Sequence, residues 1–133
     1  MRYVLDACAM IAYLRGESGG SVVDEMLRSQ SDECYAHTVN LIEVYYDFIR
    51  MHSEQTARKA LLDLTTYGLI ERKAMARAFA LRVGRLKARS GISLADCFCI
   101  ALAQDIGGQV VTSDHTEFDP LVALQIVPIR FIR

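Results

Sequence analysis

The sequence lacks several features that would assign it to a specialised class of protein. Its 133 residues include only two prolines and eight glycines, which excludes a collagenous or linker-like chain. The four cysteines form no CxxC pair, and no histidine–cysteine spacing suits a structural zinc ion. No GxxxxGK[ST], GxGxxG or nucleophile-elbow segment occurs, which argues against NTPase, dinucleotide and serine-hydrolase chemistry.

Nor is there an apolar run of the ~18–20 residues that a membrane span requires. The apolar stretch near the N-terminus superficially resembles a signal peptide, but Asp6 interrupts it. We interpret the four cysteines as reduced and mostly buried thiols. These observations together predict a cytoplasmic protein with no membrane partner.

About half of the chain is apolar, at 52% hydrophobic residues with a mean hydropathy of +0.18, which is enough to bury a core. The length predicts one domain over residues 1–133. We expect N-caps at Ser21, Thr38, Ser53 and Ser93, and a turn at Asp119-Pro120. The expected strands are 3–5, 34–36, 69–70, 109–112 and 124–129, and the expected helices are 7–14, 22–28, 39–52, 54–66, 73–88 and 94–106. This alternation predicts an α/β fold with a mostly parallel sheet.

The net charge of −1 excludes an overall cationic nucleic-acid binder, yet the charge is unevenly distributed. Residues 1–54 hold nine acidic and four basic side chains, and residues 91–133 hold five acidic and two basic ones. Between them, residues 55–90 hold nine basic and only two acidic side chains. This segment is either a solvated helix face or a surface that holds an RNA backbone.

Four acidic residues lie among apolar neighbours, where a carboxylate is costly unless it is paired or bound to a metal. Asp6 and Asp114 each follow a predicted strand, and Glu43 and Asp96 each lie early in a predicted helix. In open α/β sheets, ligands bind beyond the carboxyl ends of the strands, where the strand order reverses. If strands 3–5 and 109–112 are neighbours there, the four carboxylates face one crevice.

Ionised carboxylates gathered in this way repel one another, at about 4 kcal/mol per pair for ~4 Å separation and an effective dielectric near 20. A divalent cation removes that penalty, and an all-oxygen ligand set suits Mg²⁺ or Mn²⁺ better than zinc. Such an ion can ionise a water molecule and stabilise charge on a phosphoryl group. The alternative is that each acid caps a helix or pairs separately with an arginine.

The residues around these acids resemble a known family. The segments Val4-Leu-Asp-Ala-Cys-Ala9, Thr38-Val-Asn-Leu-Ile-Glu-Val44, Leu94-Ala-Asp-Cys-Phe-Cys-Ile-Ala-Leu-Ala103 and Val110-Val-Thr-Ser-Asp-His-Thr-Glu-Phe118 are similar to those of PIN domains. Within that family the chain is most similar to the VapC-like toxins of toxin–antitoxin pairs. The resemblance spans nearly the whole chain.

The resemblance implies a three-layer α/β/α sandwich and Mg²⁺- or Mn²⁺-dependent cleavage of RNA by water, leaving a 3′-hydroxyl and a 5′-phosphate. It assigns catalysis and metal binding to Asp6, Glu43, Asp96 and Asp114, and a supporting hydrogen-bonding role to Thr112. It also implies a homodimer that a cognate antitoxin silences by inserting a segment into the active-site groove. The chain departs from the family pattern at Cys8, where Ser or Thr is frequent and a hydroxyl can support the metal site.

Four polar residues lie near the acids in sequence. Asn40 and Asp47 lie one helical turn either side of Glu43. We expect Asn40 to orient the site, and Asp47 to form a salt bridge or face solvent. Glu117 and Asp119 lie close enough to Asp114 in sequence to supply a fifth ligand, although Asp119-Pro120 is more typical of a turn.

Two other functions compete with a ribonuclease toxin. One is a non-catalytic PIN-like module that binds RNA or protein, which the loss of an acid would favour, yet all four acids are present. The other is a haloacid-dehalogenase-type phosphohydrolase. That class requires Asp-x-Asp after its first strand, whereas this chain has Asp6-Ala-Cys8. The sequence does not identify the RNA-binding residues or the target.

Overall fold

A computed structural model describes all residues, 1–133, and contains one five-stranded parallel sheet. The spatial order of the strands is β3-β2-β1-β4-β5. Their bounds are β1 Arg2–Leu5, β2 Glu33–His37, β3 Ile70–Arg72, β4 Gln109–Thr112 and β5 Ile129–Phe131. The predicted α/β class is therefore confirmed, and every strand pair is parallel.

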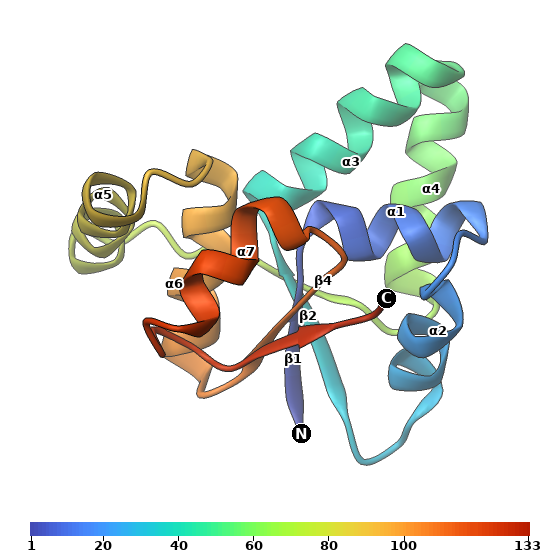
Figure 1. The fold of residues 1–133 in the computed structure, drawn as a ribbon. Coiled ribbons are helices and arrows are strands. Elements are labelled where there is room, and N and C mark those ends of the chain that lie inside the picture. Colours follow the sequence, from blue (N-terminus) through green and yellow to red (C-terminus); the bar gives the residue numbers. More distant parts are fainter.

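Seven helices cover the two faces of the sheet (Figure 1). They are α1 Ala7–Arg15, α2 Gly20–Arg28, α3 Thr38–Met51, α4 Glu54–Thr66, α5 Arg77–Ser90, α6 Leu94–Ile106 and α7 His115–Val122. Side chains alternate across a strand, so Tyr3 and Leu5 pack with α1 to α4, whereas Val4 packs with α5 to α7. The result is the three-layer α/β/α sandwich that the resemblance implied.

Two of the predicted helix caps are confirmed. The Ser53 hydroxyl accepts a hydrogen bond from the Thr56 N–H at 3.1 Å, and the Ser93 hydroxyl accepts one from the Asp96 N–H at 3.2 Å. The cap prediction at Thr38 is wrong, because the His37 ring nitrogen Nδ1 accepts the Val39 N–H at 3.0 Å and the helix begins one residue earlier. Ser21 is not a cap either, since α2 begins at Gly20.

Three segments differ from their predicted structure. Helix α5 begins at Arg77 and not at residue 73, because the segment before it is extended and its Ala74 carbonyl accepts a hydrogen bond from His37 at 2.8 Å. The last strand lies at Ile129–Phe131 and not at 124–129, since its register is set by pairing with β4. The predicted turn at Asp119-Pro120 is wrong, because both residues belong to α7.

The strand order reverses between β1 and β4, which are paired at the centre of the sheet. The chain moves from β1 to β2 on one side, and from β4 to β5 on the other. Asp6 follows β1 directly, and Asp114 lies two residues after β4. The expectation that these two strands are neighbours is therefore confirmed, and both acids lie at the carboxyl edge of the sheet at its switch point.

Other properties of the chain agree with the sequence analysis. All four cysteines are free thiols, with Cys8 half-buried and the others buried. None of the seven helices combines the length and the apolar character that crossing a membrane demands. Asp47 forms the expected salt bridge, with its carboxylate 2.6 Å from the Arg15 guanidinium.

Candidate metal centre

Asp6 is a buried carboxylate at the junction of β1 and α1, with a relative exposure of 1%. One of its oxygens accepts the Ala9 N–H at 2.8 Å, so Asp6 is the N-cap of α1. The other oxygen accepts a hydrogen bond from the Thr112 hydroxyl. Burial raises the pKa of Asp6 to about 7, although both hydrogen bonds oppose the shift.

Thr112 connects two of the predicted acids. Its hydroxyl donates to Asp6 and accepts the Asp114 N–H at 2.9 Å. Asp114 in turn accepts the Glu117 N–H at 3.0 Å and thereby caps α7. The end of β1 and the end of β4 are thus joined by side-chain hydrogen bonds as well as by the ladder of the sheet.

Asp96 lies in the first turn of α6 and is only 9% exposed. Its pKa is raised to about 6, chiefly by burial and also by the negative charges of Glu117 and Asp114, although the hydrogen bond from Ser93 opposes the shift. The pKa values of Asp6 and Asp96 are both raised, which favours the protonated form of each carboxyl group. Each carboxyl group therefore lacks a cationic partner in this structure.

Glu43 and Asn40 approach this edge from α3. The Asn40 amide nitrogen donates to the Ala95 carbonyl at 3.1 Å, which joins the first turn of α3 to the first turn of α6. Burial raises the pKa of Glu43, and Asp96 and Glu117 add to the shift. Two oxygens, Glu43 Oε1 and Asn40 Oδ1, are buried without any hydrogen-bond partner. Orphaned buried acceptors are rare in proteins, and a cation satisfies them.

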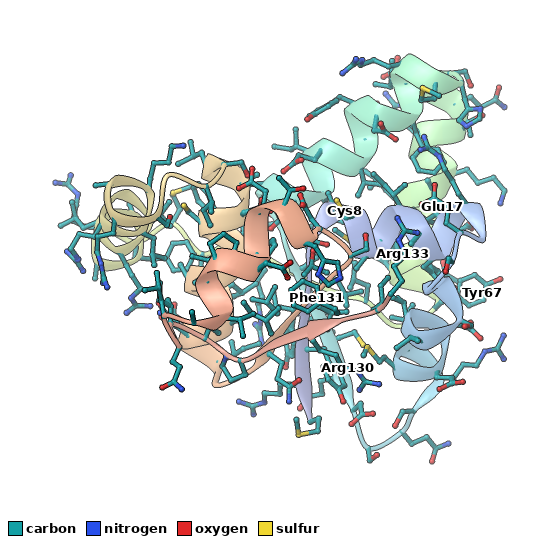
Figure 2. All side chains as sticks on the ribbon, viewed as in Figure 1. Cys8, Glu17, Tyr67, Arg130, Phe131 and Arg133 are labelled. Atoms are coloured by element: carbon teal, nitrogen blue, oxygen red, sulfur yellow. The ribbon has the colours of Figure 1, made fainter.

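The Cys8 thiol is influenced by the charges of all four acids. Burial raises the pKa of this thiol to about 12, and the charges of Asp6, Asp114, Asp96 and Glu43 all contribute to the shift. Cys8 lies at the start of α1, beside the N-terminal end of α3 (Figure 2). The four acids that the sequence singled out therefore all lie within electrostatic range of Cys8.

The acids do not form a complete set of metal ligands in this structure. No three acidic, histidine or cysteine side chains lie close enough to one another to hold a single metal ion. The Asp6 and Asp114 carboxylates instead accept hydrogen bonds from the backbone N–H groups of Ala9 and Glu117. The donor set itself is rich in carboxylate oxygens, which are the ligands that Mg²⁺ and Mn²⁺ prefer.

The structure distinguishes the two candidates for a fifth acid. Glu117 lies near Asp96 and Glu43, since its charge raises the pKa of both. Asp119 instead pairs with His115, with 2.8 Å between its carboxylate and Nδ1. Glu117 is on the same helix, one turn after the N-cap Asp114. The sequence did not separate the two because it predicted a turn where α7 forms.

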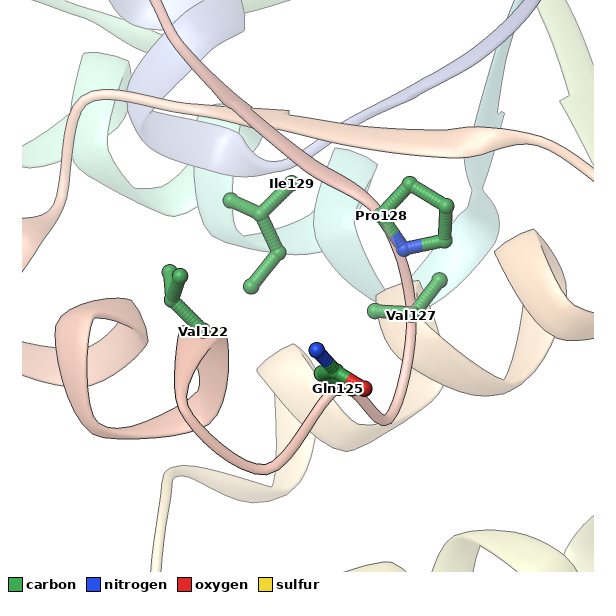
Figure 3. Close-up of a pocket in the computed structure, with 5 residues that line it drawn as sticks. All are labelled: Val122, Gln125, Val127, Pro128 and Ile129. Atoms are coloured by element: carbon green, nitrogen blue, oxygen red, sulfur yellow. The ribbon is translucent and has the colours of Figure 1, made fainter.

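The hollows on the surface lie away from these acids. Five are present, and none is lined by any of the four predicted site acids. The one drawn in Figure 3 has a volume of about 310 Å³ and no charged lining residue; it is bounded by Val122, Gln125, Val127, Pro128 and Ile129. It lies at the α7–β5 connection and offers no acid–base or metal chemistry.

The sequence matches the family model of the PIN domain over residues 3–120. No curated protein sequence matches the chain. Among solved structures, VapBC2 from Rickettsia felis, bound to a DNA fragment from its promoter, superposes with a TM-score of 0.74 at 14% identity, covering 98% of each chain.

Two further structures have the same fold. A toxin–antitoxin complex from Klebsiella pneumoniae gives a TM-score of 0.71 at 18% identity, covering 98% of each chain. VapC20 from Mycobacterium tuberculosis, a sarcin-ricin-loop-cleaving toxin, gives 0.70 at 12% identity, covering 89% of this chain and 94% of its own. At these identities the similarity establishes the fold alone.

Proposed function

The chain belongs to the PIN-domain family, and from that membership we propose that it is a metal-dependent endoribonuclease, the toxin of a toxin–antitoxin pair. The observation that carries the proposal is that Asp6, Asp96 and Glu43 are buried or half-buried without a cationic partner near the switch point of the sheet. Separate structural roles do not account for these acids. Asp6 and Asp114 cap helices, but Glu43 has a buried oxygen with no partner and none of the four pairs with an arginine.

The proposed cofactor is Mg²⁺ or Mn²⁺, held by these four carboxylates. The raised pKa values of Asp6, Asp96 and Glu43 support it, because each reflects negative charge buried without compensation. The orphaned Glu43 Oε1 supports it independently. When bound, such a cation supplies an ionised water and neutralises charge on the phosphodiester.

The remaining residues of the site act as supports. Thr112 fixes the Asp6 and Asp114 carboxylates relative to each other, and Asn40 fixes the distance between α3 and α6. Such positioning matters because groups around a metal must hold their geometry while the substrate reacts. The family resemblance implies that O3′ is the leaving group: the water oxygen would bond to phosphorus, the P–O3′ bond would break and O3′ would take up a proton. We therefore expect a 3′-hydroxyl and a 5′-phosphate.

We propose RNA as the substrate and an antitoxin protein as the cognate partner. VapC20 is described as a toxin that cleaves the sarcin-ricin loop, and the other two structures contain a toxin and its antitoxin, which supports both proposals by analogy. Exposed apolar side chains on α3, at Ile42, Tyr46 and Ile49, are consistent with protein contacts there, including those of the proposed homodimer. The free thiols suit a reducing cytoplasm.

The alternative is a PIN-fold module that binds RNA or protein without cleaving it. The absence of a closed ligand shell is the observation that favours this alternative. Calorimetric titration separates the two functions, because a binding module takes up neither Mg²⁺ nor Mn²⁺.

Cleavage of total cellular RNA by the purified protein tests the proposal directly. We expect cleavage with Mg²⁺ or Mn²⁺, none in excess EDTA, and none from Asp6→Asn or Asp96→Asn. Asp24→Asn is the matched control, since Asp24 is an acid on α2 in a surface ion pair with Arg28. Undiminished cleavage in EDTA, or by both site variants, contradicts a metal-dependent mechanism.

A further inference from the structure

One segment of the chain contains no acid at all. Between Glu71 and Asp96 there are seven basic side chains and no acidic one, in a protein whose net charge is −1. The seven are Arg72, Lys73, Arg77, Arg82, Arg85, Lys87 and Arg89. They occupy the end of β3, the connection to α5, and α5 itself.

Three of the seven are engaged within the protein. Arg82 forms an ion pair with Asp105 on α6. The Lys87 ammonium donates to the Ile92 carbonyl at 2.6 Å, and the Arg72 guanidinium lies 5.1 Å from the centre of the Tyr35 ring. The other four, Lys73, Arg77, Arg85 and Arg89, are exposed and have no ion pair.

The free arginines form an inclined stripe on the exposed surface of α5. Arg85 and Arg89 are four residues apart and adjacent on the helix, and Arg77 lies two turns before Arg85, rotated from it by roughly 80° around the axis. At 1.5 Å per residue the stripe is about 18 Å long. The opposite face holds the buried Phe79, Val83 and Leu86, which fix the helix against the core.

Helix α5 lies near the acidic end of the sheet. Its Phe79 ring stacks on His37, at the carboxyl end of β2, with 5.6 Å between ring centres, and lies 6.0 Å from Phe98 on α6. Its last turn is close to Cys97, the neighbour of Asp96, because Ser90 and Lys87 both influence that thiol. In Figure 1, α5 flanks α6 on the side away from β1.

We propose that the exposed stripe of α5, made of Arg77, Arg85 and Arg89, together with Lys73, binds the phosphate backbone of the RNA and guides it to the acids. This inference rests on the proposed function, since it assigns the substrate contacts of that same site. A phosphodiester that approaches several carboxylates is repelled, and fixed positive charges alongside lower that barrier.

The composition of the stripe favours a nucleic-acid backbone over a protein partner. The proposed surface holds no carboxylate to pair with a partner's lysines, and its large exposed apolar side chains are Met75 and Leu81. No aromatic residue is exposed between positions 72 and 95, so the segment has no surface on which bases can stack. It therefore adds affinity for any RNA sequence and does not select the cleavage site.

Binding of a 5′-labelled single-stranded RNA, measured against salt concentration, tests this assignment. The parent protein is Asp96→Asn, which we expect to bind RNA without cutting it. In that background Arg85→Ala with Arg89→Ala is expected to weaken binding by about tenfold or more, and to reduce the slope of log K against log[salt] by about 1.4, or 0.7 per lost phosphate contact. A scrambled RNA of equal length is expected to show the same losses.

The matched control removes the same charge elsewhere. Arg28→Ala with Arg58→Ala alters two exposed arginines on α2 and α4, on the opposite face of the sheet. We expect binding close to that of the parent, and we expect Arg85→Lys with Arg89→Lys to retain most of the affinity. Equal losses in the two double-alanine variants, or a parent that does not bind RNA, overturn the assignment.

Turnover separates this inference from the proposed function. This test uses the double variant Arg85→Ala with Arg89→Ala in which all four acids are native. We expect it to hydrolyse bis(p-nitrophenyl) phosphate at the native rate, because that substrate is too small to reach α5. We expect it to cleave long RNA less efficiently, through a higher KM. If the native protein hydrolyses neither substrate, the nuclease proposal fails while the binding result stands. If the variant cleaves long RNA normally, or loses only binding to a co-expressed protein partner, the inference fails.

Discussion

The Thr112 hydroxyl donates a hydrogen bond to the Asp6 carboxylate across 106 residues of sequence. The same oxygen accepts the Asp114 N–H, so one small side chain positions two acids that the chain brings from different strands. Valine has almost the same shape as threonine but cannot form either bond. This contact therefore allows the geometry of the site to be altered without altering its charge.

Thr112→Val is expected to lower RNA cleavage by about 10–100-fold, the usual effect of losing a group that orients a metal ligand. It is also expected to raise the pKa of Asp6 further, because the lost hydrogen bond opposes the effect of burial. Cleavage rates measured against Mn²⁺ concentration check this. Thr66→Val, at the exposed end of α4, is the control, and a rate for Thr112→Val equal to that of this control contradicts the role.

Asp6→Asn is expected to stabilise the metal-free protein at pH 8 while it abolishes cleavage. Asparagine is an equally good N-cap, so the bond from the Ala9 N–H is retained. The buried negative charge, whose pKa is raised to about 7, disappears, with a gain on the order of 2 kcal/mol. Urea unfolding with and without Mn²⁺ measures the effect, and a loss of stability in the metal-free variant contradicts the account.

Metal affinity is expected to rise with pH between about 5 and 7.5. The pKa values of Asp6 and Asp96 are raised to about 7 and about 6, so protons must leave before a cation binds. The same shifts stabilise the metal-free fold fully below about pH 4. That contribution is lost progressively as the pH rises from about 4 to about 7, because the unfolded chain ionises first.

Calorimetric Mn²⁺ titrations at pH 5.5, 6.5 and 7.5, each in two buffers of different ionisation enthalpy, detect the released protons. An affinity independent of pH across this range contradicts the involvement of these two carboxyl groups. Thermal unfolding of the metal-free protein over pH 4–8 provides the independent check, with the transition temperature expected to decrease as the pH increases.

Glu117→Gln is expected to weaken Mn²⁺ binding and RNA cleavage, whereas Asp119→Asn is not. The two acids lie on the same helix, but only the charge of Glu117 reaches Asp96 and Glu43. Asp119 is exposed and pairs with His115. Isothermal titration of the two variants, with melting curves to confirm folding, measures the difference; equal affinities rule out Glu117 as a fifth acid.

The sequence correctly predicted helix caps that depend only on residues a few positions apart. Ser53 and Ser93 cap their helices as expected, because a cap satisfies N–H groups only two or three positions away. The cap at Thr38 was wrong, since the His37 ring, held by the Ala74 carbonyl, accepts that N–H instead. Helix α7 was missed because Asp119-Pro120 carries a strong turn signal, while its Asp114 cap was considered only as a site acid.

The sequence alone determined which residues deserved attention: four acids in apolar surroundings are costly in any fold, so their presence calls for a partner or a function. Only the tertiary structure decided how these acids are placed relative to the sheet. Contacts between distant segments place β1 beside β4 and join α3 to α6 through Asn40. They also bring Glu117, and not Asp119, within electrostatic range of Asp96. Such contacts arise from the packing of the whole chain, which no local pattern of residues specifies.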